Sequence, residues 1–95
     1  TRVDLTQVDL SNASLPFSNL TGMDLSNRNL NSINLMFANL TGANLTGSNL
    51  TDANLNQTNL SKANLSGANL TSNNVIGTKF CRTIMPDRSV NNSGC

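Results

Sequence analysis

The chain contains no histidine, glutamate, tyrosine or tryptophan, and its 95 residues include only two cysteines and three aromatic residues, all phenylalanine. Catalysis generally needs a positioned acid, base, nucleophile or metal ion. Because histidine and glutamate are missing and the thiols are not clustered, few side chains can supply such chemistry. We therefore expect a protein that is not an enzyme, that uses no cofactor and that holds no metal ion.

Charge and long apolar runs are also scarce. Six basic and five acidic residues leave a net charge of +1, which favours neither nucleic acid as a partner nor a strongly acidic surface. No segment approaches the roughly 18 consecutive apolar residues that span a bilayer, so we expect no direct membrane insertion. Because Thr1 is not Met and the repeat described below is in phase from Val3, we expect that a leader or further coils have been removed.

Leucine recurs with a period of five. All fourteen leucines fall on multiples of five, from Leu5 to Leu70, and the series continues with Val75 and Phe80. The residue two positions before each of them is usually small, and all six alanines occupy that position. Asp, Asn or Ser precedes every leucine, and Thr, Ser or Asn usually follows it. The repeating unit is therefore A(N/D)L(S/T)X.

A period of five excludes the two common regular structures. In an α-helix a step of five rotates the leucine by roughly 140°, which spreads leucines around the whole circumference. In a straight strand an odd spacing sends successive leucines to opposite faces. If the chain turns once per repeat, every leucine and every small residue faces one shared interior. Asn, Asp, Ser and Gly suit such turns, so the pattern predicts a polygonal solenoid.

The tandem A(N/D)LXX unit resembles the pentapeptide-repeat family over residues 3–80, in sixteen consecutive units. The resemblance implies an all-β fold, a right-handed quadrilateral parallel β-helix with four repeats in each coil. We therefore expect about four coils over residues 1–80. At a strand spacing of roughly 4.8 Å they would form a post about 20 Å tall.

Two residues depart from the repeat. Arg28 occupies an interior position where a small residue is expected, and a buried guanidinium without a partner is very unfavourable. We expect either a bulge in that face or an arginine side chain that escapes outward. Asn73 breaks the same rule near the end of the repeat, where we expect the last coil to loosen.

The segment 81–95 lacks the repeat, and we expect it to form a C-terminal cap. Pro86 cannot donate a ladder hydrogen bond, and Pro-Asp favours a turn. A cap would cover an open sheet edge that otherwise invites aggregation. Cys81 and Cys95 bracket the segment, and no histidine or further thiol is present to complete a metal site with them. If bonded, they would close a loop of 15 residues and stabilise the cap by about 3 kcal/mol. The alternative is two unrelated thiols.

The ending FCRTIMPDRSVNNSGC resembles the endings of many pentapeptide-repeat proteins from cyanobacteria and plastids, although Arg88 stands where glycine is common. If the disulfide forms, an oxidising compartment is implied, with the thylakoid lumen or a periplasm favoured.

One corner of the implied four-sided coil carries unusual residues. Residues separated by four repeats lie above one another there, so Pro16 and Phe17 should adjoin Met36 and Phe37 on the outside. Aromatic residues and methionine are enriched at protein interfaces. We hypothesise that this apolar patch docks onto another protein or a multisubunit complex, for example a lumen-side photosynthetic complex, and that the chain is an accessory subunit. The alternatives are a loop folded over the corner, association with a second copy, or scattered surface hydrophobes.

Two other functions are less well supported. Some pentapeptide-repeat proteins mimic DNA and inhibit topoisomerases, but that needs a column of negative charge, and Asp52 is the one acid of the repeat region beyond residue 24. An ice-binding surface would need a uniform array of threonine, whereas one face reads Thr6, Ser26, Thr46 and Ser66.

Overall fold

Each repeat turns directly after its leucine. In the computed structural model, which describes residues 9–72 and 74–95, the Ala13 N–H donates to the Leu10 carbonyl oxygen at 3.1 Å, and Asn12 between them has a φ of 62°. A positive φ at the third residue of such a turn is the type II pattern. The equivalent residues, five apart, all have φ between 53° and 71°: Asn12, Phe17, Gly22, Asn27, Ser32, Phe37, Gly42, Gly47, Asp52, Gln57, Lys62, Gly67, Ser72, Gly77 and Arg82. We call these the left-handed turn positions.

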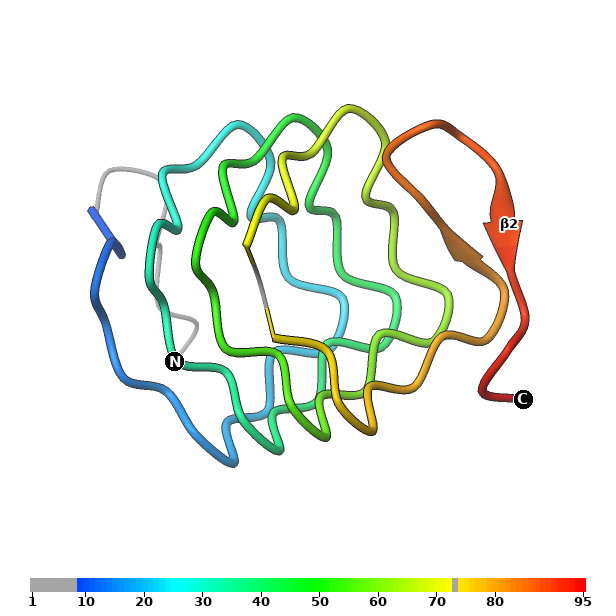
Figure 1. Ribbon diagram of the computed structural model, residues 1–95, viewed down its shortest axis with the longest axis horizontal. Helices are drawn as coiled ribbons and strands as arrows, with labels where there is room; N and C mark the ends of the chain where they lie inside the picture. Colours follow the sequence, from blue (N-terminus) through cyan, green and yellow to red (C-terminus); the bar gives the residue numbers. More distant parts are fainter. Residues whose placement is uncertain (1–8, 73) are drawn as a thin grey trace.

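The turns wind the chain into stacked coils joined by a parallel ladder. Bridges link each extended segment to the one four repeats later, from Ser14 with Asn34 to Asn64 with Ile84, all in parallel orientation. A separation of four repeats means that each coil has four sides. Figure 1 shows the coils lying side by side, with the C-terminal segment at one end of the stack. The prediction of a right-handed quadrilateral parallel β-helix is confirmed.

The two named strands lie in the C-terminal segment. β1 (Thr83–Ile84) pairs with β2 (Val90–Asn91) in antiparallel orientation (Figure 1). β1 also belongs to the parallel ladder, because the Leu65 N–H donates to the Ile84 carbonyl oxygen at 2.7 Å and the Gly67 N–H to that of Pro86 at 3.0 Å. The ladder thus extends past Phe80, where the sequence repeat ends. The first part of segment 81–95 completes the last coil, and the remainder folds back over it.

Leucine fills the interior at nearly constant volume. The nine leucines from Leu25 to Leu65 are at most 1% exposed, whereas Leu15 and Leu70, near the two ends of the described stack, are only partly buried. Burial of each such side chain stabilises the fold by about 1.5–3 kcal/mol relative to leaving it exposed. A coil therefore depends on its neighbours above and below to cover its leucines.

Buried hydroxyl groups extend the ladder into the interior. Thr58 Oγ1 donates to the Leu35 carbonyl oxygen at 2.7 Å, and Thr83 Oγ1 donates to that of Leu60 at 2.6 Å. Ser48 and Thr78 make the same bond to a leucine carbonyl oxygen of the preceding coil. A buried hydroxyl is unfavourable without a partner. This bond explains why serine and threonine replace alanine at interior positions, which the sequence pattern alone does not reveal.

Arg28 does not cause a bulge, which is the first of the two alternatives expected for it. The bridges of Asp24 with Asn44 and of Asn29 with Asn49 keep the same register on both sides of it. The Asn49 N–H donates to the Arg28 carbonyl oxygen at 2.9 Å, so the backbone of Arg28 stays in the ladder. The side chain escapes only in part, since the residue is half-buried and its Nε has no hydrogen-bond partner among the described residues. Asn73 lies outside the described residues.

We predict that Leu50→Ala lowers the free energy of unfolding by about 2–5 kcal/mol, because Leu50 is fully buried and its removal leaves a cavity between two coils. Val75→Ala is the matched control, because Val75 occupies the leucine position of the last coil but is 41% exposed. Urea unfolding measures both changes. Equal losses for the two variants would contradict the assignment of the core.

Candidate functional site

Pro16, Phe17, Met36 and Phe37 lie together on one corner of the post, which we call the aromatic corner. The rings of Phe17 and Phe37 are stacked, with centroids 4.9 Å apart and an angle of 3° between their planes. The Phe17 N–H donates to the Met36 carbonyl oxygen at 3.0 Å, so the ladder holds the two coils in register. Phe17 is 75% exposed and Phe37 48% exposed. The structure thus places the four predicted residues side by side, with Pro16, Phe17 and Phe37 exposed and Met36 half-buried.

The fold does not require phenylalanine at these positions. Phe17 and Phe37 occupy left-handed turn positions, with φ of 62° and 61°. That conformation disfavours bulky residues, by roughly 1–2 kcal/mol each. The ring stack contributes only about 0.5–1.5 kcal/mol in return. Glycine occupies the equivalent position five times in the repeat, and asparagine fits it as well. The two phenylalanines are therefore poorly explained by stability.

The same corner becomes polar in the following coils. The Gln57 side chain lies over Gly77, where an added Cβ would come within 2.3 Å of the Gln57 Nε2 atom. Asn56 Oδ1 accepts a hydrogen bond from the Ile76 N–H at 2.9 Å. In the coil after Asn56 and Gln57, Ile76 is 70% exposed, so another apolar side chain lies at the C-terminal end of this corner.

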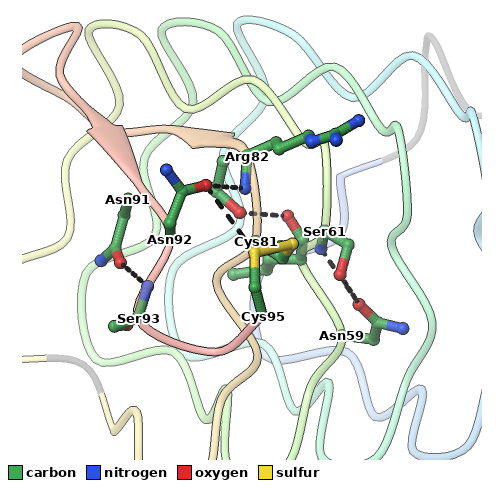
Figure 2. The surroundings of a disulfide bond; sticks show 10 residues. Asn59, Ser61, Cys81, Arg82, Asn91, Asn92, Ser93 and Cys95 are labelled. Carbon is green, nitrogen blue, oxygen red and sulfur yellow. Dashed lines mark hydrogen bonds between the residues drawn. A yellow bond between two sulfur atoms is a disulfide. The ribbon is translucent and has the colours of Figure 1, made fainter.

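Cys81 and Cys95 form a disulfide, with Cα atoms 4.8 Å apart (Figure 2). The Lys62 N–H donates to the Cys81 carbonyl oxygen at 2.8 Å, so Cys81 belongs to the last coil. Cys95 ties the chain end back to this coil. Figure 2 shows the Asn92 side chain beside the disulfide, where its Oδ1 accepts a hydrogen bond from the Arg82 N–H at 2.9 Å.

The chain end approaches the last coil closely at Gly94. The Gly94 N–H donates to the Phe80 carbonyl oxygen at 2.8 Å, and an added Cβ would lie 2.8 Å from the Phe80 nitrogen. Only glycine fits this contact without a shift of the backbone. Disulfide, hydrogen bonds and close packing together hold the C-terminal residues over one part of the last coil.

Two exposed aspartates have a lowered pKa because a following serine donates hydrogen bonds to each carboxylate. The Ser89 hydroxyl and N–H donate to Asp87 and lower the pKa of that carboxyl group, and the Ser11 N–H does the same for the pKa of Asp9. Both carboxylates are exposed and ionised at neutral pH. Within residues 9–72 and 74–95 there is no cluster of three His, Cys, Asp or Glu residues that could hold a metal ion. The same residues contain no helix long and apolar enough to cross a bilayer.

A family profile for pentapeptide repeats matches residues 1–27, 18–57 and 48–85, with eight copies. The matched ranges cover most of the chain, and the four-sided coil described above agrees with them. The chain therefore belongs to the pentapeptide-repeat family.

Several solved structures of cyanobacterial pentapeptide-repeat proteins are similar. alr5209 from Nostoc PCC 7120 matches with a TM-score of 0.73 and 38% identity, covering 74% of this chain and 58% of that one. HetL from Nostoc sp. strain PCC 7120, a protein involved in heterocyst differentiation regulation, matches with a TM-score of 0.54 and 34% identity, covering 82% of this chain and 43% of that one. Rfr23 from Cyanothece 51142 matches with a TM-score of 0.51 and 38% identity, covering 68% of this chain and 41% of that one. The chain thus spans between 41% and 58% of the length of these relatives. A comparison with curated proteins gives no match.

We predict that the double variant Cys81→Ser with Cys95→Ser loses up to about 3 kcal/mol of stability, because the unfolded loop is no longer closed. Urea unfolding measures the loss, and amide hydrogen exchange should accelerate at Arg82 and Gly94. Wild-type protein in reducing buffer is the control and should behave like the variant. Unchanged unfolding and unchanged exchange would show that the disulfide does not hold the cap.

Proposed function

We propose that this protein is a non-enzymatic interaction module that docks onto another protein, or onto a multisubunit assembly, through the aromatic corner. The observation that carries the proposal is the exposure of Phe17, at 75%, in a backbone conformation that disfavours a bulky side chain. Burial against a partner would supply the apolar contact that the fold itself leaves unused.

The physical form of the corner supports docking. Large aromatic side chains dominate the binding energy of protein interfaces. The backbones of Phe17 and Phe37 are tied into the ladder between coils, and their rings are stacked on one another. Little side-chain entropy is then left to lose on binding, which favours affinity for a given contact area.

The disulfide supports an oxidising compartment, because disulfides persist where thiols are not kept reduced. The resemblance of the C-terminal ending to cyanobacterial and plastid sequences favours the thylakoid lumen or a periplasm. In this setting we propose an accessory subunit of a larger assembly, and a photosynthetic complex on the lumen side is the specific version. Association with a second copy is the competing explanation of the same surface.

We predict that Phe17→Asn with Phe37→Asn abolishes docking but preserves the fold. Asparagine tolerates a positive φ, as Asn12 and Asn27 do here. Relief of strain at the two positions, about 2–4 kcal/mol together, therefore offsets the lost ring stack of about 0.5–1.5 kcal/mol, and the variant should be at least as stable as the wild type. The measurement is affinity capture from the native source, then identification of the captured chains and reconstitution with purified components. Thermal unfolding of both proteins checks the fold.

The control is Ser32→Asn with Asp52→Asn, which changes the equivalent turn positions on a neighbouring corner. It should capture the same partner as the wild type. Equal capture by all three proteins would refute docking at the aromatic corner. Sedimentation of the purified wild type tests the competing explanation, because a dimer that dissociates on the Phe→Asn change would assign the corner to self-association.

A further inference from the structure

The exposed charges of the post are unevenly distributed. We define the cationic side as the four stacked segments 16–22, 36–42, 56–62 and 76–82. The ladder joins them directly, for example through the Gly22 N–H to the Thr41 carbonyl oxygen at 2.9 Å and the Gly42 N–H to that of Ser61 at 2.8 Å. These segments contain three basic residues, Lys62, Lys79 and Arg82, and no acidic residue.

The three basic side chains gather at the C-terminal end of this side. Lys62 and Arg82 occupy left-handed turn positions of successive coils, with φ of 60° and 53°, so they stack at the ladder spacing of about 4.8 Å. Lys79 lies three residues before Arg82, where its backbone forms a parallel bridge with Asn59 and its side chain faces outward. All three are exposed. Figure 2 shows the Arg82 side chain extended away from the disulfide.

No described residue balances this charge. Among residues 9–72 and 74–95 the acids Asp9, Asp24, Asp52 and Asp87 all lie outside the four segments. None of the three cations forms an ion pair with another described residue. Like charges stacked on adjacent coils repel one another, so the cluster lowers the stability of the fold slightly. Like the aromatic corner, it is a feature that folding does not explain.

Both features lie on the same side of the post. Phe17 and Phe37 line one edge of the cationic side toward the N-terminal end, and Lys62 and Arg82 line the other edge toward the C-terminal end. Ile76, 70% exposed, stands on the aromatic edge level with the cations. A ligand lying across this side would meet apolar contacts and positive charge together.

We infer that the partner presents an acidic segment with apolar side chains, which lies across the cationic side. Its carboxylates would face Lys62, Lys79 and Arg82, and its apolar groups would cover the aromatic corner. Complementary charge of this kind accelerates association and selects the partner. The inference rests on the proposed function, because it assumes that the aromatic corner docks a protein, and it adds the chemistry of that protein.

The same surface suits nucleic acid and lipid less well. Proteins that bind DNA tightly neutralise roughly six to ten phosphates, and three cations are too few. Single-stranded nucleic acid stacks successive bases on aromatic platforms, whereas Phe17 and Phe37 cover one another's faces. Clusters that recognise anionic lipid carry about four to eight basic residues. A protein segment needs only a few ion pairs in addition to its apolar contacts.

The test is a titration of the ¹⁵N-labelled protein followed by NMR. The probes are a short synthetic peptide of Glu, Leu and Ser and its counterpart with Gln in place of Glu. At low ionic strength the Glu peptide should bind roughly tenfold more tightly than the Gln peptide, because three exposed ion pairs add a modest free energy. It should shift the amide signals of both the cationic cluster and the aromatic corner.

Variants separate the two parts of the surface. Lys62→Glu with Arg82→Glu should remove the preference for Glu over Gln, whereas Phe17→Asn with Phe37→Asn should weaken both peptides alike. The control is Arg88→Glu, because Arg88 is also exposed and has a positive φ, of 70°. It follows β1, however, whereas Arg82 of the cationic side precedes β1. This control should leave the preference unchanged. Circular dichroism confirms that each variant folds.

Equal binding of the two peptides to the wild type would overturn the inference. A loss of the preference for Glu in Arg88→Glu as large as that in Lys62→Glu with Arg82→Glu would also overturn it. If Lys62→Glu with Arg82→Glu keeps the preference for Glu over Gln, while Phe17→Asn with Phe37→Asn weakens the binding of both peptides, the proposed function stands and only the acidic partner is refuted. Vesicles containing phosphatidylserine and an oligothymidylate are titrated in parallel. Charge-dependent binding to either one, with no binding of the Glu peptide, would assign the cations to lipid or nucleic acid and would also overturn the inference.

Discussion

The whole structure depends on one constraint, which is that the chain turns once in every repeat. Each turn places one residue at a positive φ and brings the next extended segment round by one side of a square. Four such turns bring the backbone into register with the preceding coil, and only then can the ladder close between coils. The leucine core follows from the same geometry, because every leucine stands at the same distance from its turn. If one turn were lost, ladder and core would both lose register from that point on.

This constraint divides the residues of each repeat into two kinds. The leucine and the small residue before it are fixed by volume, and Thr58 or Thr83 can replace alanine only because their hydroxyls reach a leucine carbonyl oxygen. The turn positions face outward and accept any residue that tolerates a positive φ. Glycine and asparagine satisfy this at low energy, so phenylalanine at two of these positions and lysine or arginine at two others stand out. The unusual residues lie on one side of the post, which is why we regard that side as the functional surface.

The sequence predicts the repeating part of the structure well and its irregular parts poorly. Leucine spacing excludes helix and flat sheet, and the family resemblance supplies the four sides that put Phe17 above Phe37. The pattern does not predict the ladder past Phe80, because Ile84 takes a place in the last coil without the leucine spacing that marks the others. Arg28 does not disturb its face as expected, because the backbone ladder on both sides keeps the register and only the side chain adjusts. The same rule of four repeats places Lys62 beside Arg82 as it places Phe17 beside Phe37. The cationic cluster is nevertheless missed in the sequence, because single basic residues at outward positions do not stand out from a polar repeat as phenylalanine does.

Docking at the aromatic corner is tested most directly by site-specific photo-crosslinking in the native source. A photoreactive phenylalanine analogue replaces Phe17 in one protein and Ser32, at the equivalent turn position of a neighbouring corner, in another. We predict a crosslinked product between the Phe17 protein and a different, acidic chain, with no such product from the Ser32 protein. Identical products from both positions, or a product at Phe17 that contains only a second copy of this chain, would contradict it.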